Sequence, residues 1–244
     1  MSSKKIRASR RILTIAEGIA NYGYAGVVYD IGADHAYLPI YLIGAGLCGS
    51  AVATDVSPPS LARARRNAAE FGLSDKISFC LGDGFSAIDD YKPGNIVVVA
   101  GIGGKNLIDI LQRGLDKAGA ASLLILQPMN SHELLREWLV NNDFNIDCER
   151  LAREEYRIYS VMFCRPGVRA PRPYSPVEIY AGRNVIYGDA DEYRHFLRFT
   201  KRKILNRYEG LSVAGGGGGR ARPEQDALGA VLKEIDALME NAVE

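Results

Sequence analysis

The chain has 244 residues, of which 47% are hydrophobic and 24% charged, and its formal net charge is +1. This composition is typical of a soluble globular protein with a sizeable core. No apolar run reaches the ~18 residues of a membrane span, and the basic N-terminus has no apolar signal-peptide core behind it. We therefore expect a cytoplasmic protein that does not associate with a membrane. Widely spaced cysteines predict reduced thiols and no metal site: Cys48, Cys80, Cys148 and Cys164.

The charge is distributed unevenly along the chain. Residues 165–222 carry 12 basic and 5 acidic groups, whereas residues 223–244 carry 1 basic and 6 acidic groups. The N-terminus is also basic and has no acidic neighbour: Lys4, Lys5, Arg7, Arg10 and Arg11. Two basic zones on a nearly neutral chain indicate a surface that binds a polyanion.

The elements predicted up to residue 166 alternate between helix and strand. Helical periodicity comes first, over residues 5–22. Five apolar strand-like segments follow, at 27–32, 49–57, 76–84, 95–104 and 122–128. Amphipathic stretches predict helices at 36–46, 58–71, 104–119 and 131–142. Residues 144–155 and 157–166 have no helix between them and predict an antiparallel hairpin. The expected order is βαβαβαβαβαββ, an α/β fold whose mostly parallel sheet has helices on both faces and an antiparallel last strand.

The character of the sequence changes near residue 165. Residues 166–188 begin with a proline-rich run that predicts a linker or crossing segment. A long basic helix follows over 189–211, then a pentaglycine break at 215–219, then a helix over 223–243 with a coiled-coil seam. Two helices of opposite charge with a short turn predict an antiparallel hairpin. The expected domains are therefore 1–165, a linker at 166–188, and a helical hairpin at 189–244.

An acid ends each of the first three predicted strands, namely Asp30, Asp55 and Asp83. Ligands of open parallel sheets bind beyond the carboxyl ends of the strands, and buried carboxylates need partners. Asp55 is placed to bind the two hydroxyls of a ribose. Asp83 is placed for an adenine amino group, and Asp30 for the ammonium of a bound amino acid. Helix capping is the simpler explanation of these acids, and for Asp55 it is compatible with binding.

The loop after the first strand distinguishes between cofactors. A dinucleotide carries a pyrophosphate and needs glycine amides at a helix N-terminus. A dinucleotide-binding loop has three glycines for this purpose, but this loop has only Gly32. S-adenosylmethionine has no phosphate and carries a positive sulfonium and an ammonium, so nearby carboxylates stabilise it. Charge therefore favours S-adenosylmethionine over NAD.

Other candidate site residues lie in the loops at the same edge. We expect Asp34 to point into the mouth of the site, and His35 to be a structural hydrogen-bond donor, with a role as a base left open. Gly101, Gly103 and Gly104 could form a floor for a flat base, or simply a tight turn. Gln127 or Asn130, after the fifth strand, could hydrogen-bond the edge of a base.

Four segments in this order resemble the bacterial TrmK family of tRNA methyltransferases: DIGADHAYLPI, GDG, VAGIGG and LILQPMNSHELLREWL. The resemblance is close over about residues 7–164. It implies a Rossmann-like class I methyltransferase domain with a C-terminal coiled-coil domain. It also implies methylation of N1 of the adenine at position 22 in tRNA, with S-adenosylmethionine as the methyl donor. The chain departs from the family at Ile102, at Met129 and in the pentaglycine run.

The resemblance and the strand-end argument together give the expected site. The catalytic residue is Asp34, whose carboxylate stabilises the charge that develops on the adenine. Expected cofactor contacts are Asp30, Gly32, His35, Asp55, Val56, Asp83, Gly84 and Gly101. Expected tRNA contacts are Arg10, Gly103, Gly104, Gln127, Asn130, Arg198 and Arg202, to which the basic helix adds Arg183, Arg194 and Arg207. Two alternatives stay open: an inactive module that binds S-adenosylmethionine and RNA, and a methyltransferase acting on another RNA base or a non-RNA substrate. We expect a monomer or weak dimer.

Overall fold

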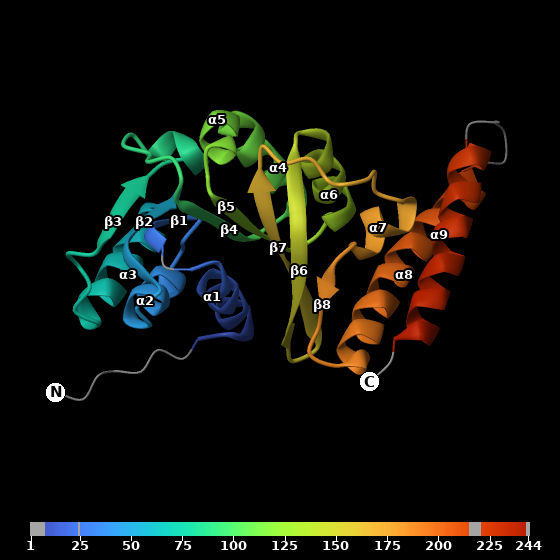
Figure 1. The fold of residues 1–244 in the computed structure, drawn as a ribbon, viewed down its shortest axis with the longest axis horizontal. Helices are drawn as coiled ribbons and strands as arrows, with labels where there is room; N and C mark the ends of the chain where they lie inside the picture. Colours follow the sequence, from blue (N-terminus) through green and yellow to red (C-terminus); the bar gives the residue numbers. More distant parts are fainter. Residues whose placement is uncertain (1–7, 24, 215–220, 243–244) are drawn as a thin grey trace.

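The computed structural model describes residues 8–23, 25–214 and 221–242. The basic residues Lys4, Lys5 and Arg7 and the pentaglycine run at 215–219 lie outside the described residues. The strands form one sheet in the order β3-β2-β1-β4-β5-β7-β6-β8 (Figure 1). The strands are β1 Ala25–Ile31, β2 Cys48–Asp55, β3 Ile77–Leu81, β4 Ile96–Ile102, β5 Leu123–Pro128, β6 Phe144–Glu154, β7 Arg157–Pro166 and β8 Val185–Ile186.

The predicted α/β class is confirmed. Strands β1 to β5 pair in parallel, and β7 runs antiparallel to both β5 and β6. Helices cover both faces, because Val28 and Val98 of the sheet belong to one buried cluster, and Tyr29 and Val97, one residue along, belong to the other. The described helices are α1 Arg10–Tyr22, α2 Tyr37–Gly44, α3 Pro58–Glu70, α4 Gly104–Arg113, α5 Leu115–Gly119, α6 His132–Asn141, α7 Pro176–Ala181, α8 Ala190–Ala214 and α9 Ala221–Asn241, with a 3-10 turn η1 at Gly84–Ala87.

Two local predictions were wrong. The expected order of elements includes a helix between the third and fourth strands, but the structure has only the 3-10 turn η1 there. The expected helix over 104–119 is two helices, α4 and α5, that meet at Gly114. A Cβ at Gly114 would overlap the ring of Phe85, so close packing selects a glycine there, and a glycine weakens a helix interior.

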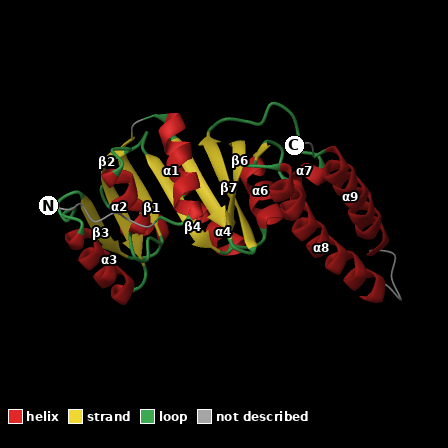
Figure 2. Ribbon diagram, turned by 90° about the horizontal axis from the view of Figure 1, so that it is seen from below, coloured by secondary structure: helices red, strands yellow, loops and turns green. Residues whose placement is uncertain are grey.

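The C-terminal helices α8 and α9 form an antiparallel pair at the β6 end of the sheet, far from β3 (Figures 1 and 2). Their direction follows from the ion pairs, since Lys201 contacts Asp236 and Arg207 contacts Glu224, both at 2.5 Å. An apolar seam between them is buried: Leu197, Ile204, Leu228, Val231 and Ile235. The expected antiparallel packing is therefore present in the described residues.

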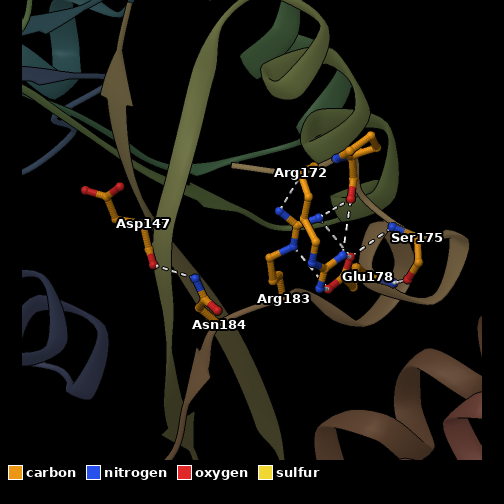
Figure 3. A network of polar contacts seen from close by, with 7 residues as sticks. Asp147, Arg172, Ser175, Glu178, Arg183 and Asn184 are labelled. Atoms are coloured by element: carbon orange, nitrogen blue, oxygen red, sulfur yellow. Dashed lines mark hydrogen bonds and ion pairs between the residues drawn. The ribbon is translucent and has the colours of Figure 1, made fainter. Parts of the chain in front are cut away.

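The segment 166–188 is more ordered than the linker that its prolines predict. It contains α7 and β8, and β8 adds to the sheet edge in parallel with β6. Ser175 and Glu178 form a capping box at the start of α7, and Arg172 and Arg183 both donate to the Glu178 carboxylate (Figure 3). Burial by itself would raise the pKa of Glu178, but the hydrogen bonds from Arg183, Arg172 and the Ser175 amide outweigh it and lower that pKa to about 2.

A fully buried ion pair joins α7 to the sheet. Arg136 on α6 donates from Nε and Nη2 to both carboxylate oxygens of Glu149 on β6, at 2.7 and 2.8 Å. Its Nη1 donates to the carbonyl oxygens of Ile179 and Tyr180 in α7, each at 2.9 Å. Ser160 on β7 donates its hydroxyl to Glu149. One guanidinium therefore connects α6, β6 and α7.

We expect Arg136→Met to lower the free energy of unfolding by about 3–5 kcal/mol, because Glu149 would then be a buried charge without its cation. Urea unfolding followed by circular dichroism measures the change. The matched control is Arg165→Met, since Arg165 pairs with Asp147 at the surface, and exposed pairs contribute less than about 1 kcal/mol. Equal costs for the two variants would contradict the anchoring role of Arg136.

Candidate active site

The candidate site lies beyond the carboxyl ends of the parallel strands. Strand order reverses between β1 and β4, which is where ligands of open α/β sheets bind. Two cavities lie there, of about 440 Å³ and about 170 Å³, and Gly32 lines both. The larger cavity is lined by Asp55, Val56, Asp83 and Gly84. The smaller cavity is lined by Asp30, Asp34, His35, Gly101 and Gln127.

In the larger cavity, which we call the strand-end cavity, Asp55 is held firmly. Its Oδ1 accepts from the amide of Ser57 at 2.8 Å and its Oδ2 from the amide of Asp34 at 3.0 Å. Each oxygen retains a second lone pair for a ligand hydroxyl. Asp83 pairs with Arg113, whose hydrogen bond lowers the pKa of the Asp83 carboxyl. Thr54 also lines this cavity, and its buried hydroxyl has no hydrogen-bond partner among the residues that the structure describes.

Asp30 is the buried acid of the smaller cavity, which we call the loop cavity. Only 5% of this residue is exposed. Burial, and secondarily repulsion from Asp55, raises its pKa to about 7. A carboxyl group with this pKa is half ionised at neutral pH. A cation placed beside it would favour the ionised form, which makes Asp30 a natural partner for a ligand ammonium.

The β1–α2 loop presents Asp34 in an unusual backbone conformation. Asp34 has φ 45° and Ala36 has φ 56°, both in the left-handed region. Asp tolerates this region better than Ala does, so the loop stores some strain at Ala36. The Asp34 side chain is 59% exposed, and its Oδ2 lies 3.3 Å from Nε2 of His35. The His35 ring stacks on Tyr37 with centroids 5.4 Å apart.

Arg11 lines the loop cavity, whereas Arg10, for which the sequence predicts a tRNA contact, does not. Arg10 pairs with Glu17 at 3.1 Å on the outside of α1. Arg11 donates from Nη1 to Gln127 Oε1 at 3.1 Å and from Nε to Glu154 Oε2 at 3.2 Å. The signal for Arg11 was present in the sequence, because Arg11 lies four residues before Ile15 and shares its helix face.

Gln127 is buried, and its amide is used within the protein. Its Oε1 accepts from the Gly101 amide at 3.1 Å and from Arg11, and its Nε2 donates to the Pro128 carbonyl at 2.9 Å. Through these contacts Gln127 positions Arg11 and the β4–α4 turn, and its contact with a base edge stays a prediction. Asn130 is exposed, and its Oδ1 accepts from the Gly104 amide at 3.2 Å, next to Gly103. That contact leaves its amide Nδ2 available.

The predicted arginines of the C-terminal part line neither cavity. Arg198 pairs with Asp191 at 3.6 Å, whereas Arg202 is exposed and has no ion-pair partner among the described residues. The other three are engaged within the protein: Arg183 with Glu178, Arg194 with the Ala242 carbonyl, and Arg207 with Glu224. The helical pair therefore offers cations outside the two cavities.

Two kinds of feature are absent from the described ranges, 8–23, 25–214 and 221–242. None of their helices is long and apolar enough to cross a membrane. They contain no cluster of three or more His, Cys, Asp or Glu side chains arranged to hold a metal ion.

Comparisons with known proteins point to one family. Residues 8–162 match the family described as "Methyltransferase domain". The chain is 33% identical over 73% of its length, and over 73% of the relative, to the tRNA (adenine(22)-N(1))-methyltransferase of Bacillus subtilis. It is also similar to the crystal structure of the B. subtilis M1A22 tRNA methyltransferase TrmK, with TM-score 0.77 and 26% identity over 96% of this chain and 100% of that one.

A second solved structure shares the fold along nearly its whole length. This Streptococcus pneumoniae protein, in complex with S-adenosyl-L-methionine, has TM-score 0.72 and 27% identity over 95% of this chain and 99% of that one. Agreement therefore covers the methyltransferase domain and the helical pair together. The chain belongs to the methyltransferase family that includes the B. subtilis tRNA (adenine(22)-N(1))-methyltransferase.

Proposed function

We propose that this protein is an S-adenosylmethionine-dependent methyltransferase that methylates N1 of the adenine at position 22 in tRNA. The observation that carries the proposal is the pair of cavities at the strand ends, where Asp30, Asp55 and Asp83 surround a space next to Asp34. Membership of the family supports the same reaction and the same substrate.

The side chains around the cavities fit S-adenosylmethionine by their chemistry. When bound, the cofactor supplies an activated methyl group on a cationic sulfonium. Asp55 would bind the ribose hydroxyls, Asp83 the adenine amino group and Asp30 the ammonium. Gly32, Gly84 and Gly101 have φ values of 76°, 61° and 76°, a backbone conformation that residues with side chains rarely adopt. Val56 is 65% exposed in the strand-end cavity and offers an apolar contact for a flat ring.

Asp34 is our candidate catalytic residue. N1 of adenine has a free lone pair, so no base is needed to expose the nucleophile, but methylation leaves a positive charge on the ring. A carboxylate beside the ring stabilises that charge and can accept the proton of N6. His35, which lies 3.3 Å from Asp34, holds the carboxylate in position.

The tRNA backbone would lie along the exposed cations. Arg202, Arg198 and Arg10 are the candidates, with Asn130 and the turn at Gly103 and Gly104 next to the base. In this proposal residues 1–165 form the methyltransferase domain, 166–188 cross between the domains, and 189–244 bind tRNA. The enzyme acts in the cytoplasm as a monomer or weak dimer, and its affinity for tRNA decreases steeply with salt.

The activity is tested by incubating the purified chain with methyl-labelled S-adenosylmethionine and bulk tRNA. Label is expected in 1-methyladenosine at position 22. A tRNA in which guanine replaces adenine 22 is the matched control and should take up no label. Label in another nucleoside would reassign the substrate, and uptake by neither RNA would overturn the proposed activity.

Replacing Asp34 should separate catalysis from cofactor binding. Asp34→Asn keeps the size of the side chain and tolerates the left-handed backbone, whereas Asp34→Ala also removes the side chain. Both variants should bind S-adenosylmethionine in calorimetry, yet lose about 10²- to 10⁴-fold in the rate of methyl transfer. An Asp34→Asn variant with wild-type kcat would refute the electrostatic role.

Cofactor affinity should depend on pH through Asp30. Its pKa of about 7 in the free protein means that protons compete with the ligand ammonium in acid. Below pH 7 the dissociation constant for the cofactor, measured by calorimetry, should increase as the pH falls, and the increase should approach tenfold for each pH unit. The reason is that the bound state needs the ionised carboxylate. Asp30→Asn should bind weakly at every pH and lack this acid dependence. The same slope in wild type and Asp30→Asn would assign the titration to another group.

A further inference from the structure

A third cavity, of about 190 Å³, lies between the methyltransferase domain and α8. Figure 1 shows the β6–β7 turn beside the first half of α8, and residues of both elements line the cavity. We call it the aromatic groove and define it by Met129, Tyr156, Arg157, Tyr159, His195 and Phe199. Its volume is several times the ~30 Å³ that one water molecule occupies in the liquid, which is room for a flat ring.

The groove exposes apolar side chains that folding does not require. Tyr156 is 87% exposed, Phe199 is 51% exposed and Met129 is 39% exposed. Tyr156 follows Glu155, whose φ is 51°, in the tight turn between β6 and β7. Such turns favour glycine, asparagine or aspartate, so an exposed aromatic ring there needs another reason. Exposed apolar side chains that cluster in one groove mark a binding site.

The groove is basic as well as aromatic. Arg157 and His195 line it, and the Lys203 ammonium lies 4.6 Å from the Phe199 ring centroid. Among the described residues that line the groove, none carries a carboxylate. Exposed rings surrounded by cations are the usual means by which proteins hold an unstacked base of single-stranded RNA.

The groove lies next to the loop cavity. The Arg11 guanidinium lies 4.6 Å from the centroid of the ring of Tyr159, a residue that lines the groove. The same guanidinium binds Gln127, which lines the loop cavity, and its Nη1 lies 3.9 Å from the sulfur of Met129. Arg11 and its neighbours thus form the wall between the cavity beside Asp34 and the groove.

We propose that the aromatic groove stacks a second unstacked base of the tRNA, next to the adenine that is methylated, against Tyr156 and Phe199. This step rests on the proposed function, in which the target adenine occupies the cavity beside Asp34. A target base has to leave its stack to reach such a cavity. A groove that holds its neighbour stabilises that opened RNA conformation.

The test measures tRNA binding rather than methylation. The full chain is titrated with tRNA that carries the fluorescent base 2-aminopurine on either side of adenine 22. Tyr156→Ala and Phe199→Ala should each weaken tRNA binding by about 5- to 150-fold, the effect of losing one base–aromatic stack. The fluorescence change at one of the two positions should disappear in the same variants. Calorimetry should give wild-type affinity for S-adenosylmethionine.

One matched variant tests whether the aromatic ring is what binds the base, and a second tests whether its location in the groove matters. Tyr156→Phe keeps the ring and should bind tRNA as the wild type does. Tyr22→Ala removes an exposed tyrosine near the amino-terminal edge of β5, where Tyr22 donates to the Ser122 carbonyl, and should leave tRNA binding unchanged.

The outcomes separate this inference from the proposed function. Wild-type tRNA affinity in both alanine variants would overturn the inference, even if adenine 22 is methylated. Sedimentation that shows a dimer lost in Tyr156→Ala, with tRNA binding intact, would overturn it too and make the groove an interface between two copies. Binding that depends on the groove without methylation would support the inference and overturn the proposed activity alone. A wild type that binds no tRNA would overturn both.

Discussion

The buried pair of Arg136 and Glu149 fixes the geometry on which the rest of the structure depends. Neither side chain has contact with water, so each charge needs the other and further hydrogen bonds to offset its desolvation. The guanidinium supplies them to β6 and to the backbone of α7 at once. Because α7 also packs on α9 and α8, this pair determines where the helical unit lies against the sheet. The aromatic groove between the sheet and α8 depends on this position of the helical unit.

The second constraint is the electrostatics of the strand ends. Asp30 and Asp55 repel each other, and burial adds to the cost of ionising Asp30. A site of this kind disfavours a phosphate and becomes stable when a cation enters. The β1–α2 loop serves this chemistry with two left-handed residues, which place Asp34 beside the mouth while its amide holds Asp55. One backbone amide thus links Asp55 in the strand-end cavity to Asp34 in the loop cavity.

Much of the fold and of the site was predictable from particular residues. Continuous apolar strands indicated a parallel sheet, and acids at three strand ends predicted the edge where the two cavities lie, because both patterns are local in sequence. The contacts of Arg11 and Gln127 could not be predicted, for the opposite reason. Their partners, Glu154 and the Gly101 amide, are distant in the sequence, and adjacent arginines such as Arg10 and Arg11 look alike until a helix face is chosen. The break at Gly114 likewise depends on the ring of Phe85, which lies across the packed core.

The sequence by itself determined the class of fold, the acidic character of the strand ends and the existence of a pair of helices, one basic and one acidic, since each follows from period, charge and local spacing. Only the tertiary structure decided which cations are free, because Arg183 and Arg207 pair with Glu178 and Glu224 and Arg194 donates to the Ala242 carbonyl. It also decided that exposed Tyr156 and Phe199 face one groove beside the active site. Those residues come from a hairpin turn and from α8, more than forty positions along the chain, so no local pattern could have joined them.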